Sequence, residues 1–169
     1  MNLKTKRLEL TPITNKDLDV FHNTNTNPFV KKYLWDNQDI PKSVSIDILN
    51  KTETKFKTEK WGLWKIINLD NEEYMGYIGF WFFFDEKLPQ LLYALLPEFT
   101  GNGYATEASH EIIDYAFKKL RFKHLIATMD KPNHNSVHVC KRLNMELIEE
   151  RVINEKTTLF FKLENRNYN

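Results

Sequence analysis

The sequence predicts an α/β fold of the mixed type (α+β), with a mostly antiparallel, twisted sheet and helices on both faces. The segments 61–68, 74–84 and 90–96 are rich in aromatic and β-branched residues and are separated by short polar breaks, which is typical of an antiparallel meander. A helical pattern at 104–120 then leads to a further strand-like segment, so the strands before and after it are expected to be parallel neighbours. A length of 169 residues suits one domain over residues 1–169.

The N-terminal part alternates a strand with two expected helices. Residues 7–13 read as a strand with Leu8 and Leu10 on one face. Thr14 and Asp17 have the spacing of a capping box, with Asp in the place of the usual Glu, and they predict the start of a short helix. Residues 23–28 are polar and turn-rich, so we expect a loop there, followed by a helix over 43–58 with Val44 and Ile48 facing inward.

The C-terminal part begins with the clearest helix of the chain. Between residues 104 and 120, apolar residues recur at steps of three or four. Residues 124–130 read as a strand, 135–143 as a short helix and 146–164 as a closing hairpin. The expected order is therefore β-α-α-β-β-β-α-β-α-β-β.

Composition excludes several classes of protein. A formal net charge of +1 and a pI near 7.8 argue against a chain whose main partner is nucleic acid. The single cysteine, Cys140, excludes an internal disulfide and a cysteine-built zinc site, and His138 with Cys140 would lie on different faces of a short helix, so we expect no metal. The N-terminus lacks a signal-peptide pattern and the apolar run 77–84 is too short for a bilayer, which predicts a cytoplasmic protein without a membrane partner.

The most informative local feature is the tripeptide Gly101-Asn102-Gly103 at a strand-to-helix junction. It lacks the lysine and hydroxyl of a P-loop, and it lacks the third glycine and the further βαβ units of a dinucleotide fold. A turn that merely ends a strand is one interpretation. The other is a diphosphate site built from consecutive backbone amides at a helix N-terminus; its residues would be Thr100, Gly101, Asn102, Gly103, Tyr104 and Ala105.

Three segments resemble the GNAT acetyltransferase superfamily. The run TGNGYA (100–105) matches that family's diphosphate signature Q/R-x-x-G-x-G/A except at its first position. The longer run YALLPEFTGNGYATEA (93–108) resembles the branch of ribosomal-protein N-terminal (alanine or serine) acetyltransferases. KRLELTP (6–12) and NHNSVHVCKRLNM (133–145) are similar to two further motifs of that branch, so the resemblance covers essentially the whole chain.

The resemblance implies an N-acetyltransferase that uses acetyl-CoA as co-substrate and acetylates a primary amine, either a protein N-terminus or a small molecule. It implies backbone contacts from Tyr93, Ala94 and Leu95 to the pantetheine arm, with the Leu95 N–H as oxyanion donor, and a contact from Asn133 to the same arm. Segments 23–42 and 84–90 would bind the acceptor. A CoA-binding sensor or scaffold without catalysis is the alternative, and both a monomer and a homodimer are compatible with the sequence.

Departures from the family pattern leave the acid and the base open. Cys140 stands where many members have a proton-donating tyrosine, and it is either a general acid or a buried packing residue. Ser136 either caps the helix that follows or binds the cofactor. Gln90 stands where the branch often has a glutamate; Glu98 and Glu107 are nearby, although Glu107 is equally explained as a first-turn carboxylate favoured by the helix dipole.

Overall fold

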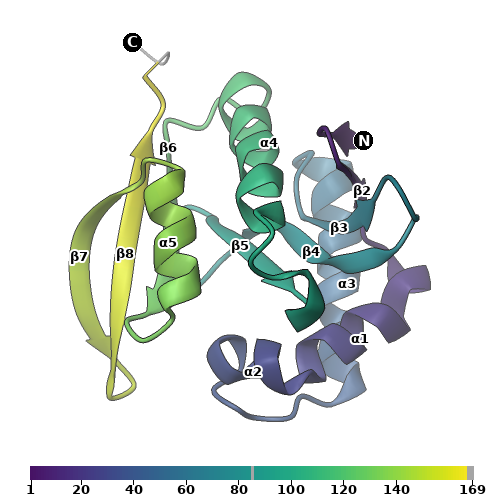
Figure 1. Ribbon diagram of the computed structural model, residues 1–169, viewed down its shortest axis with the longest axis horizontal. Coiled ribbons are helices and arrows are strands. Elements are labelled where there is room, and N and C mark those ends of the chain that lie inside the picture. Colours follow the sequence, from purple (N-terminus) through teal and green to yellow (C-terminus); the bar gives the residue numbers. More distant parts are fainter. Residues whose placement is uncertain (85, 167–169) are drawn as a thin grey trace.

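In the computed structural model, which describes residues 1–84 and 86–166, the strands form two antiparallel sheets (Figure 1). The five-stranded sheet has the order β1-β2-β3-β4-β5, and the three-stranded sheet has the order β6-β8-β7. The strands of the first sheet are β1 (Leu3–Lys4), β2 (Leu8–Pro12), β3 (Leu63–Asn68), β4 (Tyr74–Trp81) and β5 (Gln90–Leu95). Those of the second are β6 (His124–Asp130), β7 (Glu146–Ile153) and β8 (Lys156–Glu164).

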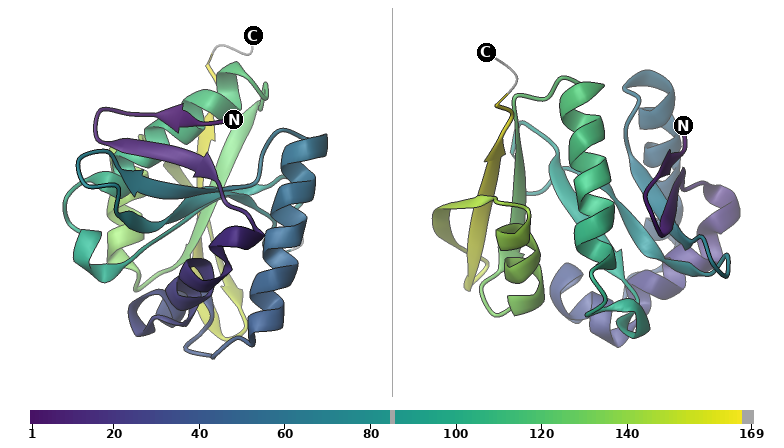
Figure 2. Two further views of the ribbon diagram at one scale, coloured as in Figure 1. Left: turned by 90° about the vertical axis from the view of Figure 1, so that its right-hand side faces the viewer. Right: turned by 45° about the horizontal axis from the view of Figure 1, so that its top comes forward.

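Helices cover both faces of the five-stranded sheet, as expected. They are α1 (Leu18–Thr26), α2 (Pro28–Leu34), α3 (Lys42–Thr58), α4 (Tyr104–Lys118) and α5 (His134–Arg142). One face of the sheet packs with α4 and α5 in the larger hydrophobic cluster, and the other packs with α1, α2 and α3 in a smaller one. Figure 2 shows α3 and α4 on opposite sides of these strands. Within the described residues, none of the helices is long and apolar enough to cross a membrane.

The expected parallel pairing of β5 with β6 is wrong in one respect. The two strands lie next to each other, but they belong to different sheets and no backbone ladder joins them. A side-chain contact spans the junction instead, because the Thr128 hydroxyl donates to Gln90 Oε1 at 2.6 Å. Gln90 is fully buried, and its Nε2 donates to the Phe83 carbonyl at 3.1 Å. The edge of β5 that faces β6 is consequently free of backbone partners along most of its length.

The loop expected at residues 23–28 is also wrong, because this segment belongs to two helices. α1 continues through the polar residues, and Asn25 at its inner face is fully buried. The Asn25 side chain donates to the Phe21 carbonyl and accepts from Tyr77 Oη and Trp35 Nε1, each at 2.8 Å. Asn27 then caps α2, where Pro28 occupies the first helical position.

Other local expectations are confirmed. Thr14 and Asp17 form the capping box, with the Thr14 amide donating to the Asp17 carboxylate at 2.9 Å. Leu8 and Leu10 are fully buried on one face of β2. The inward face of α3 is partly as expected, since Ile48 packs against the smaller hydrophobic cluster, but the fully buried residues of the helix are Ser45, Leu49 and Thr52.

Candidate active site

The glycine turn joins the end of β5 to the start of α4. Gly101 and Gly103 have φ angles of 78° and 80°, in the left-handed region that glycine adopts without steric cost. Within the described part of the chain, the backbone amides of residues 101–106 have no hydrogen-bond acceptor. Six consecutive free donors at the N-terminus of a helix of 15 residues have the arrangement that is suited to bind an anion.

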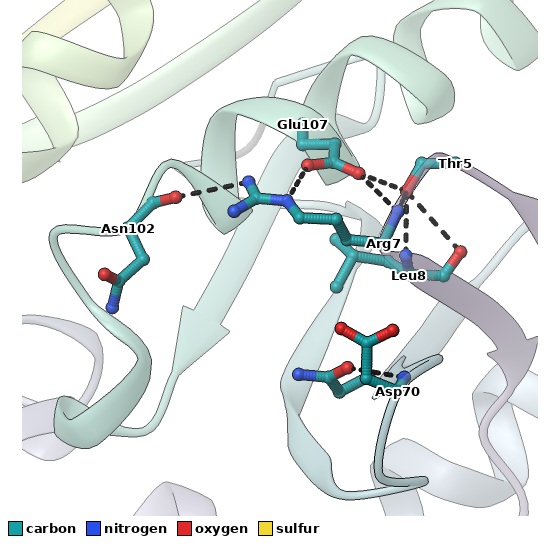
Figure 3. A network of polar contacts seen from close by, with 7 residues as sticks. Thr5, Arg7, Leu8, Asp70, Asn102 and Glu107 are labelled. Atoms are coloured by element: carbon teal, nitrogen blue, oxygen red, sulfur yellow. Dashed lines mark hydrogen bonds and ion pairs between the residues drawn. The ribbon is translucent and has the colours of Figure 1, made fainter.

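A polar network ties this turn to the first strands of the chain (Figure 3). The Arg7 guanidinium donates to Glu107 on α4 at 2.7 Å and to the Asn102 carbonyl in the turn at 3.2 Å, and it lies 4.2 Å above the Tyr104 ring. Glu107 also accepts from the Thr5 hydroxyl at 2.5 Å and from the Arg7 amide at 3.0 Å. Arg7 therefore binds the turn through the Asn102 carbonyl and leaves the backbone amides of the turn free.

This network also fixes the charge state of Glu107. Partial burial raises the pKa of the carboxyl group, but the hydrogen bonds from Thr5 and Arg7 outweigh burial and lower its pKa below the ordinary value. A carboxylate with a lowered pKa and three donors is a poor proton acceptor, so Glu107 serves the structure of the turn.

The pairing of β5 with β4 decides which of its backbone groups are free. The Leu96 amide donates to the Met75 carbonyl at 3.0 Å, and Leu95, the residue before it, lies opposite Gly76. Hydrogen-bonded and non-hydrogen-bonded pairs alternate along an antiparallel ladder, so the N–H and C=O groups of Leu95 and Tyr93 point away from β4. Those of Ala94 point toward it. The free groups face the junction with β6.

A cavity of about 310 Å³ lies at this junction and reaches the glycine turn. Its walls come from β5, from the second half of β6, from the turn and the start of α4, and from α2 and α5. The residues from the two strands are Leu91, Leu92, Tyr93, Ala94, Leu95, Ala127, Thr128, Met129 and Asp130. A mostly apolar cavity with a free strand edge on one side and an anion site at one end suits a long ligand that has an anionic group along its length.

Comparison with known proteins assigns the family. The model of the acetyltransferase (GNAT) domain matches residues 7–146. The chain belongs to the GNAT acetyltransferase family. The N-acetyltransferase YnaD of Bacillus subtilis (strain 168), described as uncharacterized, is 28% identical over 146 residues, which are 86% of this chain and 82% of that protein.

Two solved structures show the same fold. The ribosomal-protein-S5-alanine acetyltransferase of Vibrio fischeri has a TM-score of 0.79 at 14% identity, with 100% of this chain and 99% of that chain covered. The spermidine N-acetyltransferase of Vibrio cholerae, solved in complex with CoA and spermine, has a TM-score of 0.77 at 18% identity, with 97% and 99% covered. The GNAT architecture, with its splayed strands, is therefore the architecture of this chain.

The start of α5 corrects one expectation about this GNAT site. Asn133 is the N-cap of the helix, and its side chain accepts from the Ser136 amide at 3.3 Å. The Ser136 side chain does not cap the helix, because the helix already begins at His134. Asn133 and Ser136 both line the cavity. The structure thus brings them to the same wall as Tyr93 and Leu95.

Cys140 lies deeper in α5 than the cavity wall. Its side chain is 1% exposed, and it packs in the larger hydrophobic cluster rather than lining the cavity. Burial raises the pKa of the thiol to about 12. Tyr93 lines the cavity, and burial also raises the pKa of its hydroxyl, so this group stays protonated at neutral pH.

The other carboxylates named from the sequence do not line the cavity. Glu98 is exposed in the turn after β5, and Gln90, in the place of the family's glutamate, is used to bridge β5 and β6. Asp130 is the only carboxylate among the described residues of the cavity wall. Burial raises its pKa, and Asp36 adds to the rise, while Lys156 opposes it. No group of three residues among the described histidines, cysteines and acids is arranged to hold a metal ion.

Sequence reasoning missed three residues of this site, which are Arg7, Thr106 and Arg142. Arg7 is about a hundred residues from its partner Glu107, so no local pattern joins them. Thr106 and Arg142 line the cavity from α4 and α5, and the start of α2 contributes Phe29 to its wall. Arg142 could have been found, because it occupies the basic position of the motif at 133–145. The α2 wall lies in the acceptor-binding segment expected at 23–42; in the other segment, 84–90, residue 85 lies outside the described residues.

Proposed function

We propose that this chain transfers the acetyl group of acetyl-CoA directly to a primary amine. The observation that carries the proposal is the continuity of one cavity from the six free amides of the glycine turn to the free edge of β5 at Tyr93 and Leu95. The free amides from Gly101 to Thr106 would hold the diphosphate, whereas the Thr100 amide, expected there from the sequence, already donates to the Pro97 carbonyl at 3.1 Å. The backbone groups of Tyr93 and Leu95 would pair with the pantetheine amides, and those of Ala94, also expected to do so, are used in the ladder with β4 instead. Asn133 would contact the same arm. The spermidine N-acetyltransferase of Vibrio cholerae, which has the same fold, was solved with CoA bound, and this supports CoA as the ligand.

The geometry supports catalysis by positioning and by oxyanion stabilisation. A neutral amine attacks the thioester carbonyl; the N–C bond forms, the C–S bond breaks, and the CoA sulfur leaves as a thiolate. The Leu95 N–H points into the cavity from the free strand edge and would donate to the oxygen as negative charge develops on it. Holding both reactants in one cavity supplies much of the remaining acceleration.

Proton transfer in this mechanism needs a base for the ammonium form of the acceptor and a proton for the thiolate. Asp130 is the carboxylate in the described part of the cavity wall, and Lys156 Nζ lies 3.7 Å from its Oδ2. Its place in the wall makes it the candidate to attract the cationic amine and to accept its proton, and burial raises its pKa, which suits a base. Cys140, which the sequence offered as the acid, has a thiol with a pKa of about 12 away from the cavity wall, so we assign it to packing. A CoA thiolate is a good leaving group and can take its proton from water.

The test is calorimetric titration of acetyl-CoA into the purified protein, followed by thiol release against a panel of polyamines, amino sugars and N-terminal peptides. We expect binding, and thiol release with one class of acceptor. The variant Gly103→Glu places a carboxylate among the free amides and should abolish binding while the protein stays folded. Binding of acetyl-CoA without release from any acceptor would favour the sensor or scaffold, and no binding by the wild type would refute the proposed function.

A further inference from the structure

Asp130 faces a cation of the chain itself from outside the cavity. It is the last residue of β6 and lines the cavity, and its side chain is 17% exposed. Lys156, the first residue of β8, places its Nζ 3.7 Å from Asp130 Oδ2. Lys156 is not part of the cavity wall, so its ammonium reaches the carboxylate from the other side. The carboxylate that is the candidate to attract the acceptor therefore already has a partner.

A second carboxylate binds the same ammonium. Asp36 lies in the connection between α2 and α3 and forms the closer ion pair with Lys156 Nζ. Its side chain is 55% exposed, so this pair lies nearer to the solvent than the one with Asp130. The Tyr33 hydroxyl on α2 donates to the Pro132 carbonyl at 3.3 Å, and Figure 1 shows the β7–β8 turn at the same end of the molecule as α2. Lys156 thus joins the α2 side of the cavity to its β6 side.

The Lys156 side chain carries the same chemical group as a protonated acceptor, namely a primary ammonium. Among the described residues, Asp130 forms no other ion pair, and the adjacent Lys131 is paired with Glu150 at 2.9 Å instead. Two ammonium groups beside one carboxylate repel each other. An acceptor ammonium that binds Asp130 therefore weakens the contact between Asp130 and Lys156.

The exchange of one ammonium for the other requires little free energy. The Lys156 side chain is 42% exposed, and ion pairs exposed to this degree contribute little because solvent screens them. Lys156 also keeps its closer partner Asp36 when it leaves Asp130. The hydrogen bond to Asp36 is the main reason why the pKa of Lys156 is raised, so the side chain stays cationic. At Asp130, burial raises the pKa and Lys156 opposes the rise, so withdrawal of Lys156 makes this carboxylate a better base.

We propose that Lys156 sets the affinity for the acceptor: its ammonium occupies Asp130 in the free protein, and the acceptor binds by displacing it toward Asp36. This inference rests on the proposed function. The affinity for an acceptor is then the difference between its own interaction with Asp130 and that of Lys156. An uncharged amine cannot replace the ammonium of Lys156, so the site admits the acceptor in its ammonium form, beside the carboxylate that then removes the proton.

The test is the KM for the acceptor, measured by thiol release at saturating acetyl-CoA with spermidine and with an alanyl peptide. Lys156→Met keeps an apolar stem and removes the competing ammonium, so the KM should fall by up to about fivefold, the range of an exposed ion pair. Asp36→Asn should raise the KM by a similar factor, because Lys156 is left with Asp130 alone. Asparagine tolerates the φ of 53° found at this position.

A double variant and a matched control isolate the role of Lys156. In the Lys156→Met background, Asp36→Asn should no longer change the KM, because there is no ammonium left to redistribute. Lys131→Met removes an equal charge from the residue next to Asp130, but this lysine is paired with Glu150, so the acceptor KM should stay within about twofold. The KM for acetyl-CoA should be the same in all of these proteins.

The outcomes separate this inference from the proposed function. Turnover with an unchanged acceptor KM in Lys156→Met would overturn the inference alone. So would a KM that falls equally in Lys131→Met, which would trace the effect to net charge, or an effect of Asp36→Asn that persists without Lys156. Failure of the wild type to bind acetyl-CoA, or to release thiol with any acceptor, would instead overturn the proposed function.

A carbon-13 NMR titration of the Asp130 carboxyl group tests the contact without any acceptor. The pKa of Asp130 should rise in Lys156→Met, because the cation that opposes the rise is gone, and it should not rise in Lys131→Met. A pKa that Lys156→Met leaves unmoved would show that Lys156 does not occupy Asp130, and it would overturn the inference.

Discussion

Replacing Glu107 by glutamine should loosen the glycine turn, and the structure allows the size of the effect to be worked out. The side chain accepts three hydrogen bonds, two from Arg7 and one from Thr5. Glutamine keeps one oxygen acceptor, but its amide nitrogen faces the Arg7 Nε donor, so the charge-assisted bond at 2.7 Å is lost. The Arg7 guanidinium is then left without a counter-charge beside the turn.

The expected loss of stability at pH 7 is about 1–2 kcal/mol. A hydrogen bond between charged groups contributes roughly 1.5–3 kcal/mol. The side chains of Arg7 and Glu107 are 38% and 20% exposed, so solvent screening reduces the figure toward the lower end. For a chain of this size, that corresponds to a fall of about 3–6 °C in melting temperature. Glu111→Gln, one helical turn further along α4, is the matched control.

The dependence on pH distinguishes this explanation from a general weakening of α4. The folded-state pKa of Glu107 is lowered, so its contribution is complete above the unfolded pKa of about 4.3 and is lost as the pH falls through the folded value. The gap between Glu107→Gln and the wild type should therefore close in acid. The pKa of Glu111 is raised, so Glu111→Gln should be neutral or slightly stabilising at pH 7. Thermal unfolding of the three proteins between about pH 7 and pH 3 measures this, and a gap that persists unchanged in acid would refute the reasoning.

Three further predictions concern the cavity and its strands. Cys140→Ala should leave turnover within a few-fold and lower stability by about 1 kcal/mol, because the thiol is buried in the core; a hundredfold loss of turnover with CoA affinity retained would make it the acid. Asp130→Asn should raise the KM for the acceptor amine several-fold and leave the KM for acetyl-CoA unchanged. In the wild type, protonation of Asp130 should weaken acceptor binding as the pH falls through the raised pKa of this residue, and the variant should not show that pH dependence. Equal effects of the substitution on both substrates would contradict this. Gly76→Ala should unfold the chain or destabilise it by more than about 3 kcal/mol, since Gly76 has a φ of 138° and an added Cβ would lie 2.0 Å from the Ala94 carbonyl oxygen; a wild-type melting temperature would be the contrary result.

Features of the fold that depend on residues close together in the chain could be predicted from the sequence. The glycine turn and the helix after it, the capping box at Thr14 and the closing hairpin all depend on neighbours along the chain, and all are confirmed. The segment 23–28 was misread because polar residues usually indicate a loop. Asn25 is instead buried by Trp35 and Tyr77, and the second of these is 52 positions away. A local sequence pattern does not identify a partner that is so distant in the chain.

In the candidate site, too, local features could be predicted from the sequence and contacts between distant residues could not. The glycine turn follows from local pattern, and the free backbone groups of Leu95 follow from its pairing with β4, so the sequence located the two elements on which the proposed function depends. The Arg7–Glu107 pair and the bridge from Thr128 to Gln90 join residues from different elements, and their positions depend on the finished fold. The carboxyl groups proposed from sequence proximity were therefore the least reliable part of the prediction.

Two arginines near the glycine turn, Arg7 and Arg142, differ in their partners. Arg7 is neutralised by Glu107 and holds the Asn102 carbonyl, so it orients the turn without presenting net charge to a ligand. If a free cation held the carbonyl side, an anion would be drawn to the wrong face of the turn. Arg142 has no ion pair and no hydrogen bond among the described residues, and it lines the cavity that reaches the turn. If the proposed function holds, Arg7 thus fixes the geometry of the amides, while Arg142 is left free to offset the charge of the bound anion.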